Sequence, residues 1–187
     1  MVIVTVEAIF YSLNRVICVD LLQIHDLSGS MMINEFGAYF GLAASIFFNS
    51  KKAIEDEFKQ NKGDYFSNLT AFLGSIFLFM YWPSFNAIFA TGMARQRSTV
   101  NTLAAISGSM LVGTYFSRLI KKSIDVETIL HAAFAGGVCM GACSDLITNP
   151  GFAMLTGAIA GGIAALGFLY GNGWFRKTFN LHDTCGV

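Results

Sequence analysis

Charged side chains are scarce in this sequence. Only 13% of its 187 residues are Asp, Glu, Lys or Arg, about half of the ~25% that is typical of soluble domains. The charges also balance, with 12 basic and 12 acidic residues, so no basic surface for nucleic acid is expected. Hydrophobic residues make up 54% of the chain and include 18 Phe. This composition excludes an ordinary soluble domain and indicates a membrane protein that crosses the bilayer several times.

The sequence also lacks the motifs of common enzymes and metal sites. Its four cysteines, Cys18, Cys139, Cys143 and Cys185, form neither a CxxC pair nor a Cys/His spacing suited to zinc. Cys139 and Cys143 share a helix face, and buried unreactive thiols are expected there. No Ser/His/Asp arrangement, phosphate-binding loop or dinucleotide-binding fingerprint is present. The start, MVIVTVEAIF, lacks the basic region and cleavage site of a signal peptide. We therefore expect no enzyme activity, no metal, no cofactor and no signal peptide.

Long apolar stretches account for most of the chain. About 20 apolar residues are needed for a helix to cross the hydrocarbon core, and six stretches qualify: about 2–23, 30–49, 66–90, 98–118, 127–147 and 151–171. The only long polar interval between them is 49–64, and no linker divides the chain. The sequence therefore predicts an all-α, polytopic membrane helix bundle of about six transmembrane helices, forming one membrane domain over residues 1–187.

The distribution of Lys and Arg predicts the orientation of these spans. One set of alternating loops holds Lys51, Lys52, Lys59, Lys62, Arg118, Lys121, Lys122, Arg176 and Lys177, whereas the other holds only Arg95 and Arg97. Because nine basic residues lie on one side and two on the other, the loops 50–65, 119–126 and 172–182 are predicted to lie in the cytoplasm. Three GxxxG pairs further predict close helix packing: Gly37 with Gly41, Gly137 with Gly141, and Gly157 with Gly161.

Polar residues inside the spans are the first candidates for function, because ionisable groups are costly in lipid. In the first span, Glu7, Tyr11 and Asn14 share one face, and Arg15 follows Asn14. This face is expected to point toward protein or water. A structural network between Glu7 and Arg15 and a vestibule for a substrate both remain open.

Two further groups stand at span ends. The Asp26 carboxylate is expected to cap the second span through free amides near Ser28 and Gly29, and it would shape the mouth of any pore there. Pro83 is expected to kink the third span near 79–83, next to an interfacial Trp82.

The fifth span carries acidic residues at its start and one histidine inside it. Asp125 and Glu127 lie at the expected helix N-terminus, where the helix dipole favours negative charge. His131 lies in an apolar run, where a histidine is more often a hydrogen-bonded core group than a ligand.

Several motifs together resemble a known family. In order along the chain they are Asp26-Leu-Ser-Gly-Ser30, Phe36-Gly-Ala-Tyr-Phe-Gly-Leu42, Met80-Tyr-Trp-Pro-Ser-Phe-Asn86, Asn101-Thr102, Ala135-Gly-Gly-Val138 and Asp183-Thr-Cys-Gly186. This set closely resembles the Rh glycoprotein branch of the ammonium transporter (Amt/Mep/Rh) family, from one end of the chain to the other.

The resemblance implies a fold and a set of partners. Members have an inverted five-plus-five helix repeat of 11 or 12 spans and form homotrimers in the plasma membrane, with an ammonia or ammonium pore in each subunit. Six spans are about half of that fold. By this resemblance, the first span here matches the family helix just before the one that carries the first pore histidine. The last span matches the helix just before the one that carries the second pore histidine. We therefore expect a central fragment or a truncated gene model.

The resemblance also implies roles for single residues. Asp26 matches an aspartate at the outer mouth, Phe85 an aromatic gate residue, and Asp125 an acidic residue near the inner exit. Asn34 stands where the family has the first histidine of a pore pair; an asparagine can donate and accept hydrogen bonds but does not titrate near neutral pH. Glu35 replaces a small neutral residue and is expected to point about 100° away, toward a neighbouring helix or an outer cavity.

Two departures support a second hypothesis. Arg15 stands where members with an acidic vestibule have a carboxylate, and a cation there would repel ammonium unless Glu7 or Glu35 neutralised it. His131 stands where blood-group-type Rh polypeptides have histidine, and those polypeptides also lack the first pore histidine. The first hypothesis is therefore an Rh-type ammonia/ammonium channel subunit, with substrate recruited near Asp26 and Trp82. The alternative is a non-conducting structural subunit that assembles with other Rh proteins.

Overall fold

The predicted helical segments are present in the predicted order. The computed structural model describes residues 2–48 and 65–171, and within these ranges the regular structure is entirely helical. The segments are α1 (Val2–Arg15) continued by the π-helix η1 (Val16–Leu21), the π-helix η2 (Ser30–Glu35) continued by α2 (Phe36–Phe48), α4 (Tyr65–Asn86), α5 (Gly92–Lys121), α6 (Val126–Gly141), and α7 (Pro150–Leu166) continued by the π-helix η3 (Gly167–Gly171).

Within the described residues, three segments are by themselves long and apolar enough to cross a membrane: Val2–Leu21, Gly92–Lys121 and Pro150–Gly171. The 16-residue α6 is a shorter apolar helix. The remaining two segments, η2–α2 and α4, contain polar residues such as Asn34 and Asn86. An all-α membrane bundle is therefore confirmed.

The segment boundaries differ from the prediction at the polar ends. The third segment ends at Asn86 instead of about 90, and it continues as helix through Pro83. The next helix begins at Gly92, so Arg95 and Arg97 lie in its first turns and not in a loop. The following helix ends at Gly141 rather than about 147, because the chain then turns back and Ser144 bonds to α5.

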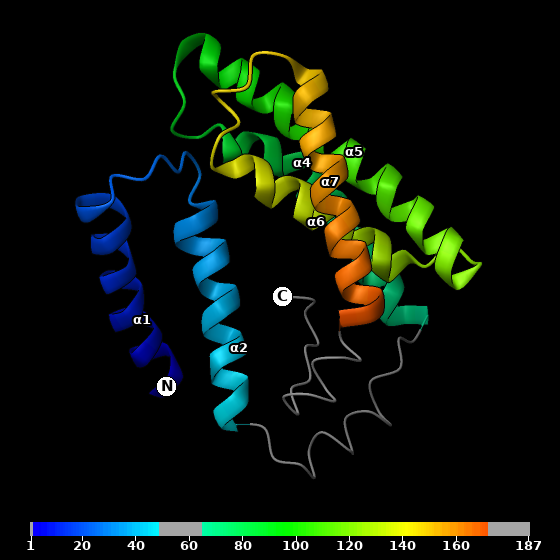
Figure 1. Ribbon diagram of the computed structural model, residues 1–187, viewed down its shortest axis with the longest axis horizontal. Helices are drawn as coiled ribbons and strands as arrows, with labels where there is room; N and C mark the ends of the chain where they lie inside the picture. Colours follow the sequence, from blue (N-terminus) through cyan, green and yellow to red (C-terminus); the bar gives the residue numbers. More distant parts are fainter. Residues whose placement is uncertain (1, 49–64, 172–187) are drawn as a thin grey trace.

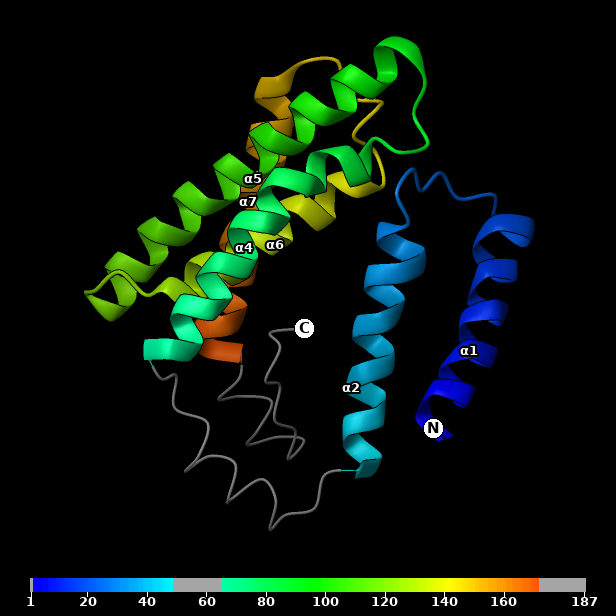
Figure 2. The same cartoon turned by 180° about the vertical axis from the view of Figure 1, so that it is seen from behind.

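The six segments form two parts (Figures 1 and 2). Figure 1 shows α1 and α2 as an antiparallel pair beside a bundle of α4, α5, α6 and α7. Both views show the pair meeting the bundle near one end and diverging from it toward the other. The loops 22–29, 87–91 and 142–149 lie at the end where the two parts meet. We call this the outer end, following the predicted orientation, and the end that holds 122–125 the inner end.

Small residues bring the bundle backbones close together. A Cβ placed on Gly157 would lie 2.1 Å from the carbonyl oxygen of Ala105, and one on Gly161 would lie 2.6 Å from Cα of Ser109. On α6, Gly137 touches the Trp82 ring, and Gly141 approaches the hydroxyls of Ser28 and Ser30. Two of the three GxxxG predictions are therefore confirmed, because these glycines admit a neighbouring helix or loop.

The third pair does not pack in this way. A Cβ on Gly37 or Gly41 would meet nothing within 4 Å among the described residues, so the prediction of close packing at this pair is wrong within this chain. These glycines lie on α2, which diverges from the bundle (Figure 1). The loops predicted to be cytoplasmic at 50–65 and 172–182, and the 183–186 motif, lie almost entirely outside the described residues.

We predict that Gly157→Ala destabilises the bundle by about 1–3 kcal/mol, because the added methyl group overlaps the α5 backbone, which cannot move aside as a side chain can. Thermal unfolding in detergent micelles measures the change. The matched control is Gly74→Ala on α4, where nothing lies within 4 Å of the new methyl group. This control should be neutral or slightly stabilising, since alanine favours helix over glycine. Equal melting temperatures for Gly157→Ala and the parent would contradict the packing account.

Candidate functional site

Asp26 organises the start of the second segment at the outer end. One carboxylate oxygen accepts the amide of Ser30 at 2.8 Å, and the other accepts the amides of Met31 and Met32 at 2.9 and 3.0 Å. Capping by Asp26 is thus confirmed, but the partners differ from the predicted Ser28 and Gly29. The helix begins only at Ser30, so the free amides of its first turn belong to the residues that follow.

Gly29 makes this turn possible. Its φ of 82° lies in the left-handed region, which favours glycine. A Cβ there would also lie 2.7 Å from Cδ1 of Ile33. The chain can therefore leave the Asp26 loop and enter η2 within one residue.

The buried side chain of Asn86 links the Asp26 loop to three helices. Its carbonyl oxygen accepts a hydrogen bond from the Ser28 hydroxyl at 3.0 Å. Its amide group donates to Thr102 Oγ1 of α5 at 3.2 Å and to the Gly137 carbonyl of α6 at 3.0 Å. Asn86 is 1% exposed. This side chain thus fixes the ends of α4, α5 and α6 relative to the loop that carries Asp26.

A second buried polar group joins α5 to the loop after α6. Asn101 donates to the backbone carbonyls of Ser144 at 2.8 Å and Ile147 at 2.7 Å. The Ser98 and Ser144 hydroxyls lie 2.6 Å apart. Asn86, Asn101 and Thr102 belong to the family motifs in the sequence, but no structural role was predicted for them. The signal that could have found them is a polar side chain at each end of otherwise apolar spans.

His25 and Asp145 form a further contact at this end. His25 Nε2 lies 3.1 Å from Asp145 Oδ1, which ties the loop after η1 to the loop after α6. Asp145 is half-buried there. Its contact with His25 spans 120 positions in the sequence, which explains why no local pattern predicts it.

Trp82 packs between helices. Its ring lies 6.0 Å from the Phe134 ring, measured between centroids, and fits against Gly137. Trp82 therefore joins α4 to α6, and its expected place at the membrane interface stays a prediction. Phe85, one turn further along α4, is 48% exposed.

Asn34 and Glu35 lie at the end of the π-helix η2. Asn34 is half-buried, whereas Glu35 is exposed, so the two side chains differ in surroundings as expected for neighbours on a helix. The backbone amide of Asn34 donates to the Gly29 carbonyl at 3.4 Å.

The polar face of the first segment turns partly toward the second. Tyr11 packs edge-on against Phe36 with 5.7 Å between ring centroids, and the Asn14 amide donates to the Met32 carbonyl at 3.4 Å. Glu7 and Arg15 are both exposed. They lie eight residues apart, or about 12 Å along a helix, and no ion pair joins them in the part of the chain described. A direct Glu7–Arg15 pair is therefore absent there.

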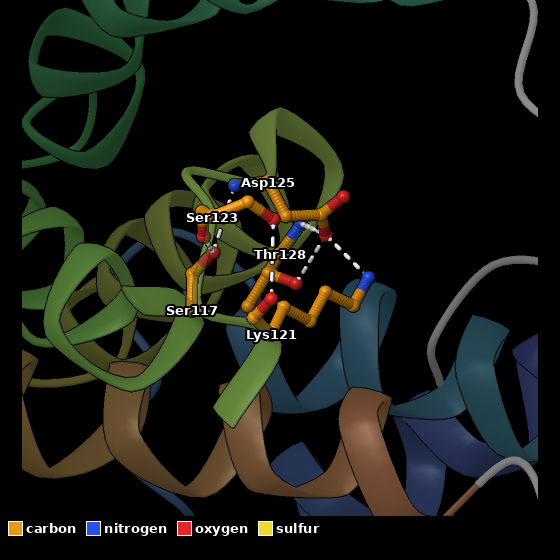
Figure 3. A network of polar contacts seen from close by, with 5 residues as sticks. All are labelled: Ser117, Lys121, Ser123, Asp125 and Thr128. Atoms are coloured by element: carbon orange, nitrogen blue, oxygen red, sulfur yellow. Dashed lines mark hydrogen bonds and ion pairs between the residues drawn. The ribbon is translucent and has the colours of Figure 1, made fainter. Parts of the chain in front are cut away.

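Asp125 organises the inner end. Figure 3 shows its carboxylate oxygen Oδ2 as the shared acceptor of three groups: Lys121 Nζ at 2.7 Å, Thr128 Oγ1 at 2.5 Å and the Thr128 amide at 3.1 Å. The Asp125 amide in turn donates to Ser117 Oγ at 2.8 Å, and Ser117 donates to the Ser123 carbonyl. The predicted position of Asp125 at the helix N-terminus is confirmed, and its side chain caps the helix.

The charge of Asp125 depends on these contacts. Partial burial by itself would raise the pKa of the carboxyl, but the hydrogen bonds from Lys121 and Thr128 outweigh it and hold the pKa below its ordinary value. Glu127 is exposed in the first turn of the same helix.

His131 belongs to the same region. Its ring is half-buried and stacks on Phe168 of η3 with 4.3 Å between centroids. Lys121 Nζ lies 5.6 Å from the centroid of the same Phe168 ring. His131 is thus a packed aromatic group that connects α6 with the end of α7. Among the described residues, no three His, Cys, Asp or Glu side chains gather as a metal site would require.

The helices and their buried polar contacts define an integral, multi-pass helical membrane protein. A family model described as the Ammonium Transporter Family matches residues 2–187, and the chain belongs to this family. The family consists of membrane transporters and not of enzymes, which agrees with the motif analysis.

Individual relatives agree with this membership. An ammonium transporter Rh type C of Xenopus tropicalis is 33% identical over 190 residues, which cover 100% of this chain and 40% of that protein. An Rh type A protein of Bos taurus is 36% identical, with coverages of 100% and 45%, and an Rh type B protein of Rattus norvegicus is 38% identical, with coverages of 97% and 40%. The chain therefore spans less than half the length of these relatives.

Solved structures have the same fold. The Rh50 protein of Nitrosomonas europaea, described as one of the Rhesus protein family of channels, matches with a TM-score of 0.85 and 30% identity over 94% of this chain and 47% of that chain. A sensor Amt protein matches with a TM-score of 0.72 and 23% identity over 87% of this chain and 40% of that chain, which shows the fold alone.

We predict that Asp125→Ala lowers the free energy of unfolding by about 1 kcal/mol at pH 7, because the helix cap is lost. The native pKa of Asp125 lies below its ordinary value of 3.8, so its stabilisation is present above that value and is lost as the pH falls through the native pKa. Thermal unfolding at pH 7 and near pH 3 should show the parent approaching the variant in acid. Glu127→Gln is the control and should change little. A parent–variant difference that is independent of pH would contradict the role of the carboxylate.

Proposed function

We propose that this chain contributes to the transport of ammonia or ammonium across a membrane as part of an Rh-type channel subunit. The observation that carries the proposal is the family match over residues 2–187, together with Rh type A, B and C relatives at 33–38% identity. The TM-score of 0.85 against a channel of the Rhesus family supports it.

The proposed pathway begins at the outer end. The Asp26 carboxylate accepts three backbone amides, and an acidic group at a mouth raises the local concentration of a cation. Substrate recruited near Asp26 and Trp82 would then pass Phe85. The exposure of this ring at 48% supports a position beside open space.

Within the proposed lumen, Asn34 offers a hydrogen-bonding group without a titratable proton. An asparagine can accept a hydrogen bond from ammonium or donate one to ammonia, but it cannot relay a proton as an imidazole can. We propose that a hydrated ion loses its water in this apolar passage and that Asp125 lies near the inner exit. Lys121 pairs with Asp125 at 2.7 Å, so the negative charge of Asp125 would be offset at that exit.

Three exposed ionisable residues fit a vestibule better than lipid. Glu7, Arg15 and Glu35 are exposed within this chain, and a charge facing hydrocarbon is costly. We propose that water or further protein covers them, with opposite charges offsetting one another. By analogy with the family, the protein would form a homotrimer, or a hetero-oligomer with other Rh subunits, in the plasma membrane.

The second candidate is a non-conducting structural subunit that assembles with other Rh proteins. Two residues favour it. Asn34 stands in place of the first pore histidine, and the His131 ring stacks on Phe168 and so serves packing. In this case the fold would be retained for assembly and the passage would not be used.

Uptake of methylammonium separates the two candidates. The full-length gene product is reconstituted in vesicles, and uptake is measured across about pH 5–8, the window in which histidine changes charge. We predict uptake above protein-free vesicles in the parent, and for Asn34→His a shift in the pH dependence within this window, because an imidazole is added to the passage.

Background uptake in both proteins would reject the channel and favour the structural subunit. A parent that already matches a histidine-bearing relative in rate and pH profile would reject the idea that Asn34 weakens the pore. Glu35→Gln is a matched control, because its exposed side chain lies beside Asn34 and adds no imidazole.

A further inference from the structure

One polar side-chain contact joins the stretch after η1 to the bundle. His25 Nε2 lies 3.1 Å from Oδ1 of Asp145, which belongs to the loop after α6. Among residues 22–26, His25 makes the hydrogen bond that reaches the bundle. In the part of the chain described, the other hydrogen bonds of this stretch return to η1 or lead into η2. The position of this stretch beside the bundle therefore depends on the contact between His25 and Asp145.

The two partners are held with different firmness. The Asp145 side chain is 16% exposed, and the carbonyl of the preceding Ser144 accepts the buried Asn101 amide of α5 at 2.8 Å. The His25 side chain is 51% exposed. Two residues before it, Gln23 has a φ of 50°, which is uncommon for a residue other than glycine. A firmly placed carboxylate thus meets a histidine on a loosely held turn.

The charge of this contact changes with pH. A histidine changes its charge between about pH 5 and 8. The contact is therefore a neutral hydrogen bond in alkaline conditions and an ion pair in acid. Hydrogen bonds between charged groups are stronger than those between neutral groups, so acid favours the state in which the two loops are joined.

Other ionisable groups lie on the elements that meet at the outer end. They are Asp20 of η1, Asp26 of the same loop, Glu35 of η2, Arg95 and Arg97 of α5, and Cys143 in the loop after α6. None of the charged ones forms an ion pair with His25 or Asp145 within the described ranges. Carboxyl, thiol and guanidinium groups ordinarily titrate outside pH 5–8. Histidine protonation at this end therefore acts on the contact with Asp145.

We propose that His25 and Asp145 form a pH-sensitive latch at the outer end of the protein. At low pH the ion pair holds the loop after η1, and with it the first segment, against the bundle. At high pH the weaker neutral contact lets the loop separate more readily. The latch itself does not require transport. Its regulation of the mouth rests on the proposed function, because the same loop carries Asp26.

Hydrogen exchange at the Leu27 amide measures the latch. This amide donates to the Ala142 carbonyl at 3.2 Å, so it is released when the two loops part. The full-length gene product is studied in lipid nanodiscs without substrate at pH 5 and pH 8. Each rate is divided by the rate in His25→Gln at the same pH, which cancels the intrinsic pH dependence of exchange. Because an exposed ion pair contributes modestly, the parent should exchange about two- to fivefold more slowly than His25→Gln at pH 5 and at an equal rate at pH 8.

Three further variants complete the test. His25→Lys carries a fixed positive charge and should exchange slowly at both pH values, whereas Asp145→Asn should abolish the pH effect. His131→Gln is the matched control, because this histidine stacks on Phe168 at the other end of the bundle and should leave the effect unchanged. A ratio of parent to His25→Gln that is the same at both pH values would overturn the proposal, and so would a pH effect that survives Asp145→Asn. Since no substrate is present, these results are separate from failure of methylammonium uptake.

Discussion

The hydrogen bonds of one buried side chain, Asn86, hold the outer end of this protein together. Its amide group reaches α5 and α6, and its carbonyl oxygen holds the Ser28 hydroxyl of the Asp26 loop. A polar group that is buried without a hydrogen-bond partner lowers the free energy of unfolding by about 1–3 kcal/mol. Removing the Asn86 side chain would leave several such groups at once, because it is the shared partner of all of them. The start of η2, and with it Asn34, therefore depends on a residue that lies more than 50 positions away in the sequence.

The rest of the architecture follows from this junction. The pair of α1 and α2 meets the bundle mainly through the loop and η2, while close packing of small residues joins α5 to α7 and α6. The inner end has its own fixed point in the Asp125 network (Figure 3). Polar contacts thus define both ends, and apolar surface between them faces lipid or further protein. This division suits a membrane protein, in which buried polar groups need partners and apolar surface does not.

Much of this arrangement could be predicted from the sequence because it depends on local patterns. Apolar stretches of about 20 residues predicted the six helical segments. Asp26 was predicted as a helix cap, and Asp125 was predicted to lie at a helix N-terminus. The contacts that place these segments could not be predicted in the same way. His25 contacts Asp145, which is 120 positions away in the sequence. Trp82 packs against Gly137 of another helix. Gly37 and Gly41 form a GxxxG pair, but no helix packs on them among the described residues. The roles of Asn34 and Phe85 in a pathway remain predictions.

Hydrogen exchange at the start of η2 tests the central claim that Asn86 positions this end. Asn86→Leu removes three hydrogen bonds while keeping a side chain of similar size, and Asn68→Leu is the control on the exposed inner half of α4. Losing these buried hydrogen-bond partners should cost about 1.4 kcal/mol or more, which corresponds to about a factor of ten in an equilibrium constant. The amides of Ser30, Met31 and Met32 should therefore exchange about tenfold faster in Asn86→Leu. In Asn68→Leu they should exchange at the parent rate. Unchanged exchange in Asn86→Leu would contradict the account.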